Sequence, residues 1–255
     1  MTTALPLAGR TALVTGGAGG LGAAICRALA EAGASVAVGY NRSAEAAQAL
    51  AASLPRLGGA RHLAVAAPVT DSASLAGTAS VMGAEYGRCD ILVNCAGTTR
   101  FVPHAELDAL DDALFDEVLA TNVRGPFAMV RAMLPLLRAA SVPGLVVNIS
   151  SIAAVTAMGS NVAYCASKAA LDNMTRSLAR ALAPQVRVVS VSPGLADTEF
   201  VKSMDPDWRD LQAERTPLRR LANPEEVALA VLACATHLPF TTGAVLPVDG
   251  GRPLV

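Results

Sequence analysis

The chain has 255 residues, of which 53% are hydrophobic and 16% charged, and its formal net charge at pH 7 is −1. This length suits one large α/β domain that buries a full hydrophobic core. The near-neutral charge gives no electrostatic reason to bind nucleic acid or acidic lipid, and no apolar run is long enough to span a membrane. The first residues show no export signal and the five cysteines form no CxxC pair, so we expect a cytoplasmic protein with reduced thiols.

Apolar runs with strand character alternate along the chain with longer, alanine-rich stretches of helical periodicity. The predicted strands cover 11–15, 35–39, 62–66, 90–94, 145–150, 186–191 and 244–248. The predicted helices cover 20–32, 43–55, 71–86, 112–138, 162–183 and 224–235. Strands that are rich in Val, Ile and Leu throughout are typical of a parallel sheet covered on both faces. The alternation therefore predicts an α/β doubly wound (Rossmann) fold with a mostly parallel seven-stranded sheet and helices on both faces.

No linker, repeat or low-complexity segment divides the sequence, so we expect residues 1–255 to form a single domain. The segment 195–219 is the stretch that interrupts the alternation, after the sixth predicted strand. Such an insertion is either a disordered loop or a lid over a binding site. We favour the lid.

A glycine-rich turn joins the first predicted strand to the first predicted helix. Glycines permit a tight turn and a close approach of the backbone to a diphosphate, and the N-terminus of the next helix directs its partial positive charge at that anion. No Gly-Lys-Ser/Thr follows, which excludes a phosphate loop of the NTPase type. The turn therefore predicts a dinucleotide site that includes Gly16, Gly19, Gly20, Leu21 and Gly22.

The end of the second predicted strand bears on the choice of cofactor. A protein that binds NAD usually has a carboxylate there, about twenty residues past the glycines, for the ribose 2′-hydroxyl. This chain has Tyr40, Asn41, Arg42 and Ser43 instead, without an acid. The guanidinium of Arg42 suits a 2′-phosphate, although a solvated surface arginine is the alternative interpretation. We therefore favour NADP(H) as the cofactor over NAD(H).

Tyr164 and Lys168 are separated by four residues in the motif YCASK, within a predicted helix. Residues at this spacing share one helix face. A free phenol, with a pKa near 10, is a poor base at neutral pH, but a cation about 4 Å away stabilises a phenolate by about 4 kcal/mol at an effective dielectric near 20. The pair is therefore predicted to donate and accept a proton near pH 7.

Other short motifs accompany this pair. They are TGGAGGLG at 15–22, NCAG at 94–97, TNVRG at 121–125, NISS at 148–151, SPGLADT at 192–198 and VDGG at 248–251. In order and spacing they resemble the motifs of the short-chain dehydrogenase/reductase family over essentially the whole chain, and the layout is similar to that of 3-oxoacyl-[acyl-carrier-protein] reductases. The resemblance implies one NAD(P)-binding Rossmann domain over 1–255 with a substrate-binding lid at 195–219.

The resemblance implies four catalytic residues. Tyr164 would exchange a proton with the substrate oxygen, and Ser151 would donate a hydrogen bond to that oxygen. Lys168 would stabilise the phenolate and hold the nicotinamide ribose. Asn122 would anchor a water that links Lys168 to solvent.

The resemblance also implies further contacts with the cofactor. The backbone of Val69 would lie beside the adenine, where the family often has an Asp before the Val and this chain has Pro68. The remaining contacts would come from Asn94, Ala96, Gly97, Pro193, Gly194, Ala196 and Thr198, in addition to Tyr164 and Lys168. Cys95 replaces the usual second asparagine of the NNAG motif, and a small residue there would only pack.

These residues predict an enzyme: an NADP(H)-dependent oxidoreductase that transfers hydride between the nicotinamide and a small-molecule carbonyl or secondary alcohol. A 3-oxoacyl-thioester reductase of the fatty-acid type is an alternative, but 141–144 and 183–185 lack the basic residues that such reductases typically carry there. A catalytically inactive nucleotide-sensing protein is a third interpretation. Enoyl reductases usually space the tyrosine and lysine more widely, and extended epimerases are longer.

The resemblance also bears on oligomeric state, and the positions of the histidines bear on metal binding. Family members mostly form homotetramers through helices near 112–138 and 162–183 and the C-terminal segment, and the apolar composition fits such an assembly. His62, His104 and His237 are too dispersed to predict a metal site.

Overall fold

The computed structural model describes residues 5–254, apart from the side chain of Phe200. Its centre is a seven-stranded sheet in the order β3-β2-β1-β4-β5-β6-β7, in which every neighbouring pair is parallel. The strands are β1 Thr11–Thr15, β2 Ser35–Tyr40, β3 Leu63–Ala66, β4 Ile91–Asn94, β5 Gly144–Ile149, β6 Val186–Pro193 and β7 Val245–Val248. The predicted doubly wound fold is confirmed, with a fully parallel sheet.

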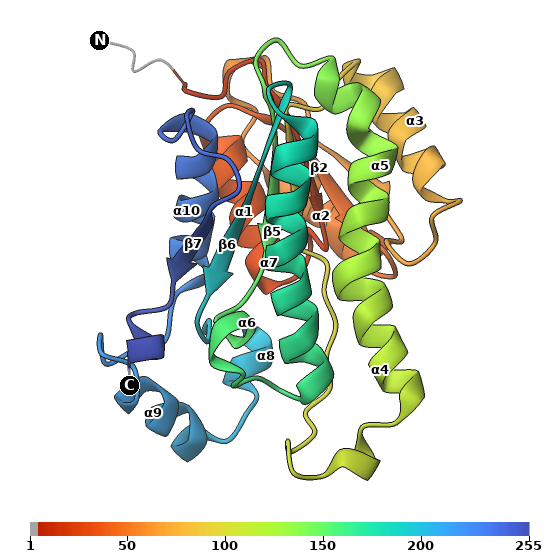
Figure 1. The fold of residues 1–255 in the computed structure, drawn as a ribbon. Coiled ribbons are helices and arrows are strands. Elements are labelled where there is room, and N and C mark those ends of the chain that lie inside the picture. Colours follow the sequence, from red (N-terminus) through yellow and green to blue (C-terminus); the bar gives the residue numbers. More distant parts are fainter. Residues whose placement is uncertain (1–4, 255) are drawn as a thin grey trace.

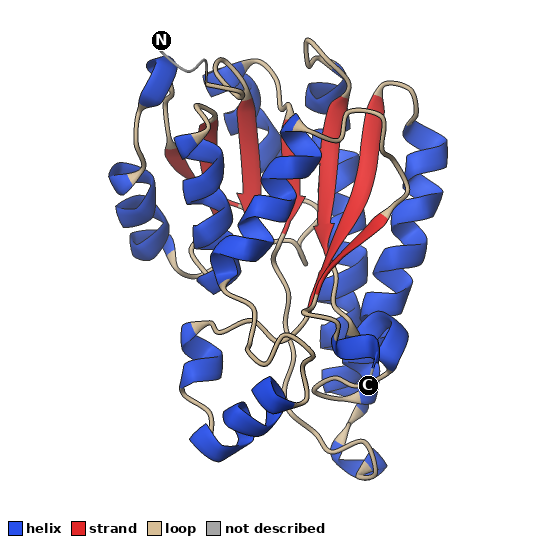
Figure 2. Ribbon diagram, turned by 90° about the vertical axis from the view of Figure 1, so that its left-hand side faces the viewer, coloured by secondary structure: helices blue, strands red, loops and turns tan. Residues whose placement is uncertain are grey.

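Helices cover both faces of the sheet (Figures 1 and 2). One face carries α1 Gly20–Glu31, α2 Ala44–Ser53 and α10 Pro224–Thr236, and the other carries α3 Leu75–Tyr86, α5 Gly125–Arg138 and α7 Val162–Leu182. The shorter helices are α4 Asp112–Leu119, α6 Ala153–Thr156, α8 Glu199–Lys202 and α9 Pro206–Glu214, and short 3₁₀ turns occur at Leu57–Gly59, Leu107–Ala109 and Arg252–Leu254. Within the described part of the chain, no helix combines the length and hydropathy needed to cross a bilayer.

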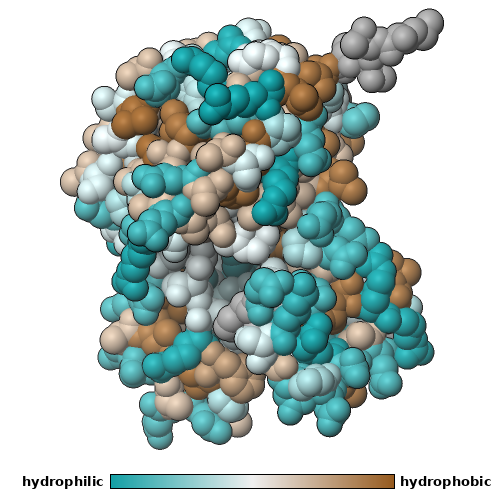
Figure 3. Space-filling view, turned by 180° about the vertical axis from the view of Figure 1, so that it is seen from behind, coloured by the Kyte–Doolittle hydropathy of each residue, from teal (hydrophilic) through white to brown (hydrophobic). Residues whose placement is uncertain are grey.

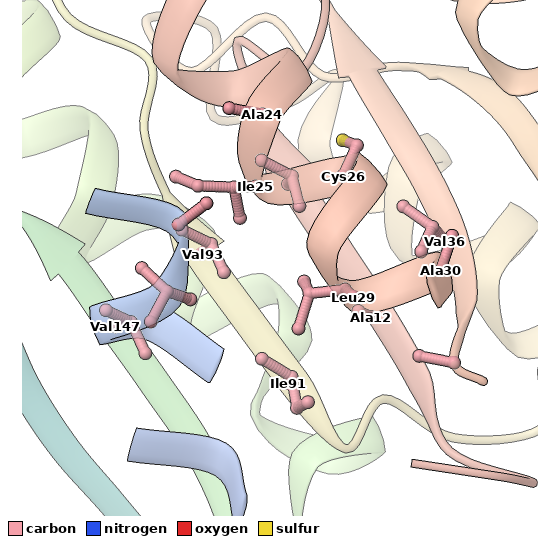
Figure 4. Packing of buried hydrophobic residues seen from close by; sticks show 14 of the residues in the cluster. Ala12, Ala24, Ile25, Cys26, Leu29, Ala30, Val36, Ile91, Val93 and Val147 are labelled. Carbon is pink, nitrogen blue, oxygen red and sulfur yellow. The ribbon is translucent and has the colours of Figure 1, made fainter. Parts of the chain in front are cut away.

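The packing of α1 on the sheet shows why the apolar runs in the sequence form this core. Ile25 and Leu29 point from α1 towards Ile91, Val93 and Val147 on the strands β4 and β5, as the close view in Figure 4 shows. All five side chains are at most 1% exposed. Burying side chains of this size stabilises the fold by about 1.5–3 kcal/mol each.

The helix predicted over 112–138 is interrupted by one π-helical turn, Ala120–Arg124, between α4 and α5. The backbone N–H of Gly125 donates to the carbonyl of Ala120, five residues earlier. Asn122 lies buried in the middle of this turn. Because π turns are rare and frequently occur at functional sites, this irregularity marks Asn122 independently of any motif.

The start of α3 differs from the sequence-based expectation, and the segment 195–219 contains regular structure that the expectation left open. The helix expected over 71–86 begins only at Leu75, because the carboxylate of Asp71 accepts hydrogen bonds from the backbone N–H groups of Ala73 and Ser74 and holds a turn there. The segment 195–219 is not a structureless loop, since it contains α8 and α9.

The strand order reverses between β1 and β4, and the loops that follow these two strands meet there. The hydroxyl of Thr15 accepts hydrogen bonds from the backbone N–H groups of Cys95 and Ala96, both at 3.1 Å. Gly16 has a φ of +61°, and a Cβ at this position would lie 3.0 Å from the Cα of Ala96. In open α/β sheets, ligands bind in the crevice outside the carboxyl ends of the strands at such a reversal.

A buried chain of polar side chains ties this end of the sheet together. The Nδ2 of Asn94 donates to the Oδ1 of Asn148 at 2.8 Å, and the Nδ2 of Asn148 donates to the Oγ1 of Thr175 at 2.8 Å. The same hydroxyl donates to the carbonyl of Leu171 at 3.0 Å and lies 2.8 Å from the hydroxyl of Ser190. These contacts connect β4, β5, β6 and α7.

We expect Thr175→Val to lower the free energy of unfolding by about 1–3 kcal/mol, because it leaves the buried amide of Asn148 without its acceptor. Thr236→Val is the matched control, since the hydroxyl of Thr236 also bonds to the carbonyl four residues earlier but is only half-buried. Urea denaturation of the two variants and the parent measures the difference. Equal losses in both variants would show that the buried chain contributes nothing of its own.

Candidate active site

The first turn of α7 places Tyr164 at the carboxyl end of the sheet. Asn161 caps this helix: its Oδ1 accepts from the backbone N–H of Tyr164 at 2.7 Å. The half-buried tyrosine ring packs beside Val118 and Ala163, and its edge lies against Gly159, where a Cβ would be 3.0 Å from the Cδ1 of Tyr164. The ring is therefore held on two sides while one end of the side chain stays accessible.

Lys168 lies one turn further along α7, on the same face. Its ammonium nitrogen is 5.6 Å from the centre of the Tyr164 ring and donates to the carbonyl of Ile149 at 2.8 Å. The residue is only 6% exposed. The structure thus brings the phenol and the ammonium together; the proton-transfer role assigned to the pair stays a prediction.

Ser151 follows β5 and precedes α6, which packs against α7. The residue is half-buried, and its Oγ accepts a hydrogen bond from the backbone N–H of Ala153 at 3.2 Å. This bond uses the oxygen as an acceptor, so the hydroxyl proton stays available for donation to a substrate oxygen, which is the expected role of this serine.

Asn122 uses its side chain to fix a neighbouring loop. Its Oδ1 accepts from the backbone N–H of Thr98 at 2.9 Å, and its Nδ2 donates to the carbonyl of Thr98 at 3.0 Å and to the Oγ of Ser167 at 3.1 Å. The amide group is therefore occupied. The water that Asn122 is predicted to anchor stays a prediction.

The geometry of the glycine-rich turn fits a dinucleotide diphosphate. A Cβ at Gly22 would lie 2.2 Å from the carbonyl oxygen of Gly16, so only glycine permits this turn. A Cβ at Gly19 would meet nothing within 4 Å except that same oxygen, at 3.3 Å, so this backbone faces open space. No side chain caps α1 and no acid lies in its first turn, which leaves its N–H groups free for an anion.

The other predicted cofactor residues lie around the same crevice. A Cβ at Gly97 would be 3.9 Å from the ammonium of Lys168, and a Cβ at Gly20 would be 2.9 Å from the Cγ2 of Thr198, which caps α8. Val69 is buried against Gly125. Leu21 lies in α1, Asn94 and Ala96 lie at the end of β4, Pro193 and Gly194 lie at the end of β6, and Ala196 forms a bridge to Ala222.

The four residues Tyr40, Asn41, Arg42 and Ser43 lie at the carboxyl end of β2 and the start of α2. Tyr40 is half-buried, and the other three are exposed. Arg42 forms no ion pair with any described residue. Its guanidinium is therefore free to meet an anion beside the crevice.

Three residues that sequence reasoning did not single out position the site. The hydroxyl of Thr15 fixes the loop after β4 by accepting a hydrogen bond from it. Thr98 belongs to the same loop, and its backbone is bound by the side chain of Asn122. Asn161, fully buried, donates to the carbonyl of Arg100 at 2.7 Å and thereby joins the loop after β4 to the start of α7. An asparagine three residues before Tyr164, at the start of a helical pattern, is an N-cap signal that the sequence does contain.

Burial raises the pKa of Cys95 to about 11, although the charge of Lys168 opposes the shift, so the thiol stays protonated at neutral pH. Between residues 5 and 254, no group of three or more His, Cys, Asp or Glu side chains is arranged to hold a metal ion.

We expect Asn161→Ala to lower the free energy of unfolding by about 2–4 kcal/mol, because it removes a helix cap and a buried donor to a backbone carbonyl. Asn161→Asp keeps the acceptor for Tyr164 but lacks the amide donor, so it should recover only part of this loss. Urea denaturation monitored by circular dichroism measures both. An Asn161→Ala variant as stable as the parent would contradict the structural role.

Comparison with known proteins identifies relatives along nearly the whole chain. A family model described as enoyl-(acyl carrier protein) reductase matches residues 16–252. Ketoacyl reductase 2 of the granaticin polyketide synthase of Streptomyces violaceoruber is 40% identical over 246 residues, which is 96% of each chain. Cis-4-hydroxycyclohexanecarboxylate dehydrogenase of Sinomonas cyclohexanicum is 41% identical over 248 residues, or 96% of this chain and 97% of that one.

Solved structures agree with these relatives. The structure of Pseudomonas aeruginosa RhlG in an active-site complex with NADP has a TM-score of 0.90 and 35% sequence identity, and the alignment covers 99% of this chain and 100% of that one. The parallel sheet, the glycine-rich turn at its reversal point and the adjacent Tyr164 and Lys168 accord with this similarity. The chain belongs to the short-chain dehydrogenase/reductase family of oxidoreductases.

Proposed function

We propose that this oxidoreductase uses NADP(H) to interconvert a carbonyl group and a secondary alcohol on a small-molecule substrate, with Tyr164 as general acid and base. The observation that carries the proposal is the buried ammonium of Lys168 beside the ring of Tyr164, at the end of the sheet where the glycine-rich turn lies. The bound nicotinamide would supply the hydride in reduction and accept it in oxidation.

The residues of the chain would handle the proton and the developing charge. In the reducing direction, the hydroxyl of Tyr164 gives its proton to the substrate oxygen while the hydroxyl of Ser151 donates a hydrogen bond to the same oxygen. Lys168 stabilises the phenolate that remains on Tyr164. The phenolate regains a proton along a path past Lys168 to a water on the carbonyl of Asn122.

Arg42 supports the preference for the phosphorylated cofactor. Its exposed and unpaired guanidinium follows β2, where a carboxylate would otherwise accept from the ribose 2′-hydroxyl of NAD. A guanidinium binds a phosphate through two parallel hydrogen bonds. The solved complex of the related Pseudomonas aeruginosa protein contains NADP.

A 3-oxoacyl-thioester reductase is the second candidate, and the identity with the granaticin ketoacyl reductase favours it. The chain lacks basic residues at 141–144 and 183–185 for docking an acidic carrier protein.

The family model that matches the chain is described as an enoyl reductase, but this description does not make alkene reduction a candidate function. Tyr164 and Lys168 are only four residues apart, and enoyl reductases usually space these two residues more widely.

The segment 195–219 would act as the lid, and the protein would assemble as a homotetramer. Thr198, the N-cap of α8 within this lid, lies against Gly20 of the glycine-rich turn, so movement of α8 would open or close the crevice. Phe115 on α4 and Phe127 on α5 are 36% and 44% exposed, and Phe240 after α10 is fully exposed. Apolar side chains on these surfaces fit burial between subunits.

We expect Tyr164→Phe to lower kcat by at least about 100-fold, because general acid–base catalysis contributes about 10²–10⁴-fold. Binding of NADPH, measured by quenching of protein fluorescence, should be retained. The control is Tyr86→Phe, whose hydroxyl donates to the carbonyl of Arg61, before the start of β3 and so at the opposite end of the strands from Tyr164. The assay follows the absorbance of NADPH with a panel of ketones, 3-oxoacyl thioesters and secondary alcohols, and wild-type turnover by Tyr164→Phe would refute the assignment.

We expect Arg42→Ala to weaken NADPH binding by at least about tenfold and to leave NADH binding unchanged, since only NADPH has the 2′-phosphate. Arg138→Ala, at the end of α5, is the control for loss of an exposed arginine. Fluorescence titration with each nucleotide measures both dissociation constants. Equal weakening for the two nucleotides would remove the basis for preferring NADP(H).

A further inference from the structure

A cavity of about 520 Å³ lies beside the segment 195–219 and is rich in arginine. It is lined by Met158, Glu214, Arg215, Pro217, Arg219 and Arg252. Glu214 is the only acid among these residues, so the lining carries three arginines and one carboxylate. The surface that surrounds α9 is predominantly hydrophilic, and a hollow lies beside it (Figure 3).

The three arginines have no acidic partners among residues 5–254. Arg252 donates to the backbone carbonyl and the side-chain oxygen of Gln212, at 2.6 and 2.7 Å, and both acceptors are neutral. Burial and, after it, the nearby charge of Arg215 lower the pKa of Arg252 from its ordinary value. Two guanidinium groups that repel each other across a cavity are stabilised when an anion binds between them.

The backbone of Arg219 points to the same conclusion. Its φ is +57°, in the left-handed region that favours glycine, and its N–H donates to the carbonyl of Thr216 at 2.7 Å to close a tight turn. A glycine would hold this turn without strain. Residues with strained backbone of this kind cluster at binding sites, where the function of the side chain offsets the unfavourable conformation.

The cavity adjoins the reacting end of the proposed site. Met158, which is 52% exposed, lines it, and the next residue, Gly159, lies against the ring of Tyr164. A small substrate whose oxygen meets Tyr164 would extend past Met158 to reach the arginines.

We propose that this cavity binds an anionic group of the substrate, so that the enzyme acts on oxo acids and hydroxy acids whose carboxylate is remote from the reacting carbon. This inference rests on the proposed function and names its substrate class. A related dehydrogenase of 41% identity is named for such a compound, cis-4-hydroxycyclohexanecarboxylate. The phosphate groups of a coenzyme A thioester offer the same chemistry, and the test separates the two sources.

The first experiment measures binding without turnover. Cyclohexanecarboxylate, and cyclohexanecarboxamide as its neutral counterpart, are titrated calorimetrically into the full-length protein with NADP present. We expect the carboxylate to bind at least about tenfold more tightly than the amide, and Arg215→Gln and Arg252→Gln each to remove about tenfold of this preference. Arg180→Gln is the control, since Arg180 lies about 24 Å further along α7 than Tyr164.

Arg219→Gly separates a loss of binding from a loss of stability. Glycine accepts the left-handed backbone, so this variant should unfold at the same temperature as the parent or higher. It should nevertheless bind cyclohexanecarboxylate more weakly. Equal binding of the carboxylate and the amide by the parent, or parent-like carboxylate binding by all three arginine variants, would overturn the proposal.

The second experiment identifies the source of the anion. Oxidation of cis-4-hydroxycyclohexanecarboxylate, of its methyl ester and of 3-hydroxybutyryl-coenzyme A is followed through the absorbance of NADPH. A higher kcat/KM for the acid than for the ester, lost in Arg215→Gln through KM, supports a small carboxylate substrate. A preference for the thioester that depends on the same arginine overturns the small-acid assignment and identifies phosphate as the bound anion. If no compound in the wider panel of alcohols and ketones reacts while cyclohexanecarboxylate still binds through the arginines, the proposed function fails and the anion site stands.

Discussion

A lysine ammonium is buried at the carboxyl end of the sheet without a carboxylate beside it, and the rest of the site is arranged around this charge. Transfer of an unpaired charge out of water is unfavourable by several kcal/mol. In the part of the chain that is described, Lys168 has the carbonyl of Ile149 and the ring of Tyr164 as its neighbours, two weakly negative groups. The ammonium therefore keeps most of its capacity to stabilise an anion, and in the proposed reaction that anion would be the phenolate of Tyr164.

Holding that charge in place requires a rigid surrounding, and the fold supplies it through buried polar contacts. The chain from Asn94 through Asn148 to Thr175 fixes α7 against the strands β4 and β5. Asn161 fixes the start of the same helix to the loop after β4. Each donor in these chains is buried and would be costly to leave unpaired, so the position of Tyr164 relative to the crevice is determined by the fold as a whole.

The sequence predicts the sheet and its layers because continuous Val, Ile and Leu runs report burial on both faces, a property that depends on a few neighbouring residues. The spacing of Tyr164 and Lys168 is equally local, and so their shared helix face could be predicted. The π turn at Ala120–Arg124 has a local signal that the sequence analysis did not use: Pro126 has no N–H to donate to the carbonyl of Asn122, four residues earlier. The contact between Asn122 and Thr98 that accompanies this turn is tertiary and could not be predicted from local sequence. The arginine cavity joins Met158, Arg215 and Arg252 from distant parts of the chain, and only the folded structure brings these residues together.

The charges of the crevice follow an order that matches the proposed chemistry. In the proposed function, Arg42 would lie beside the nucleotide, Lys168 at the reacting centre and Arg215 at the far end, while the net charge of the whole chain is −1. The positive potential is therefore local: it arises from the placement of a few unpaired cations and not from an excess of basic residues. Such a crevice would attract a dinucleotide phosphate and an acidic substrate to opposite ends. Their reacting atoms would then meet at the one cation in the middle that the fold has buried, where its effect on a developing negative charge is strongest.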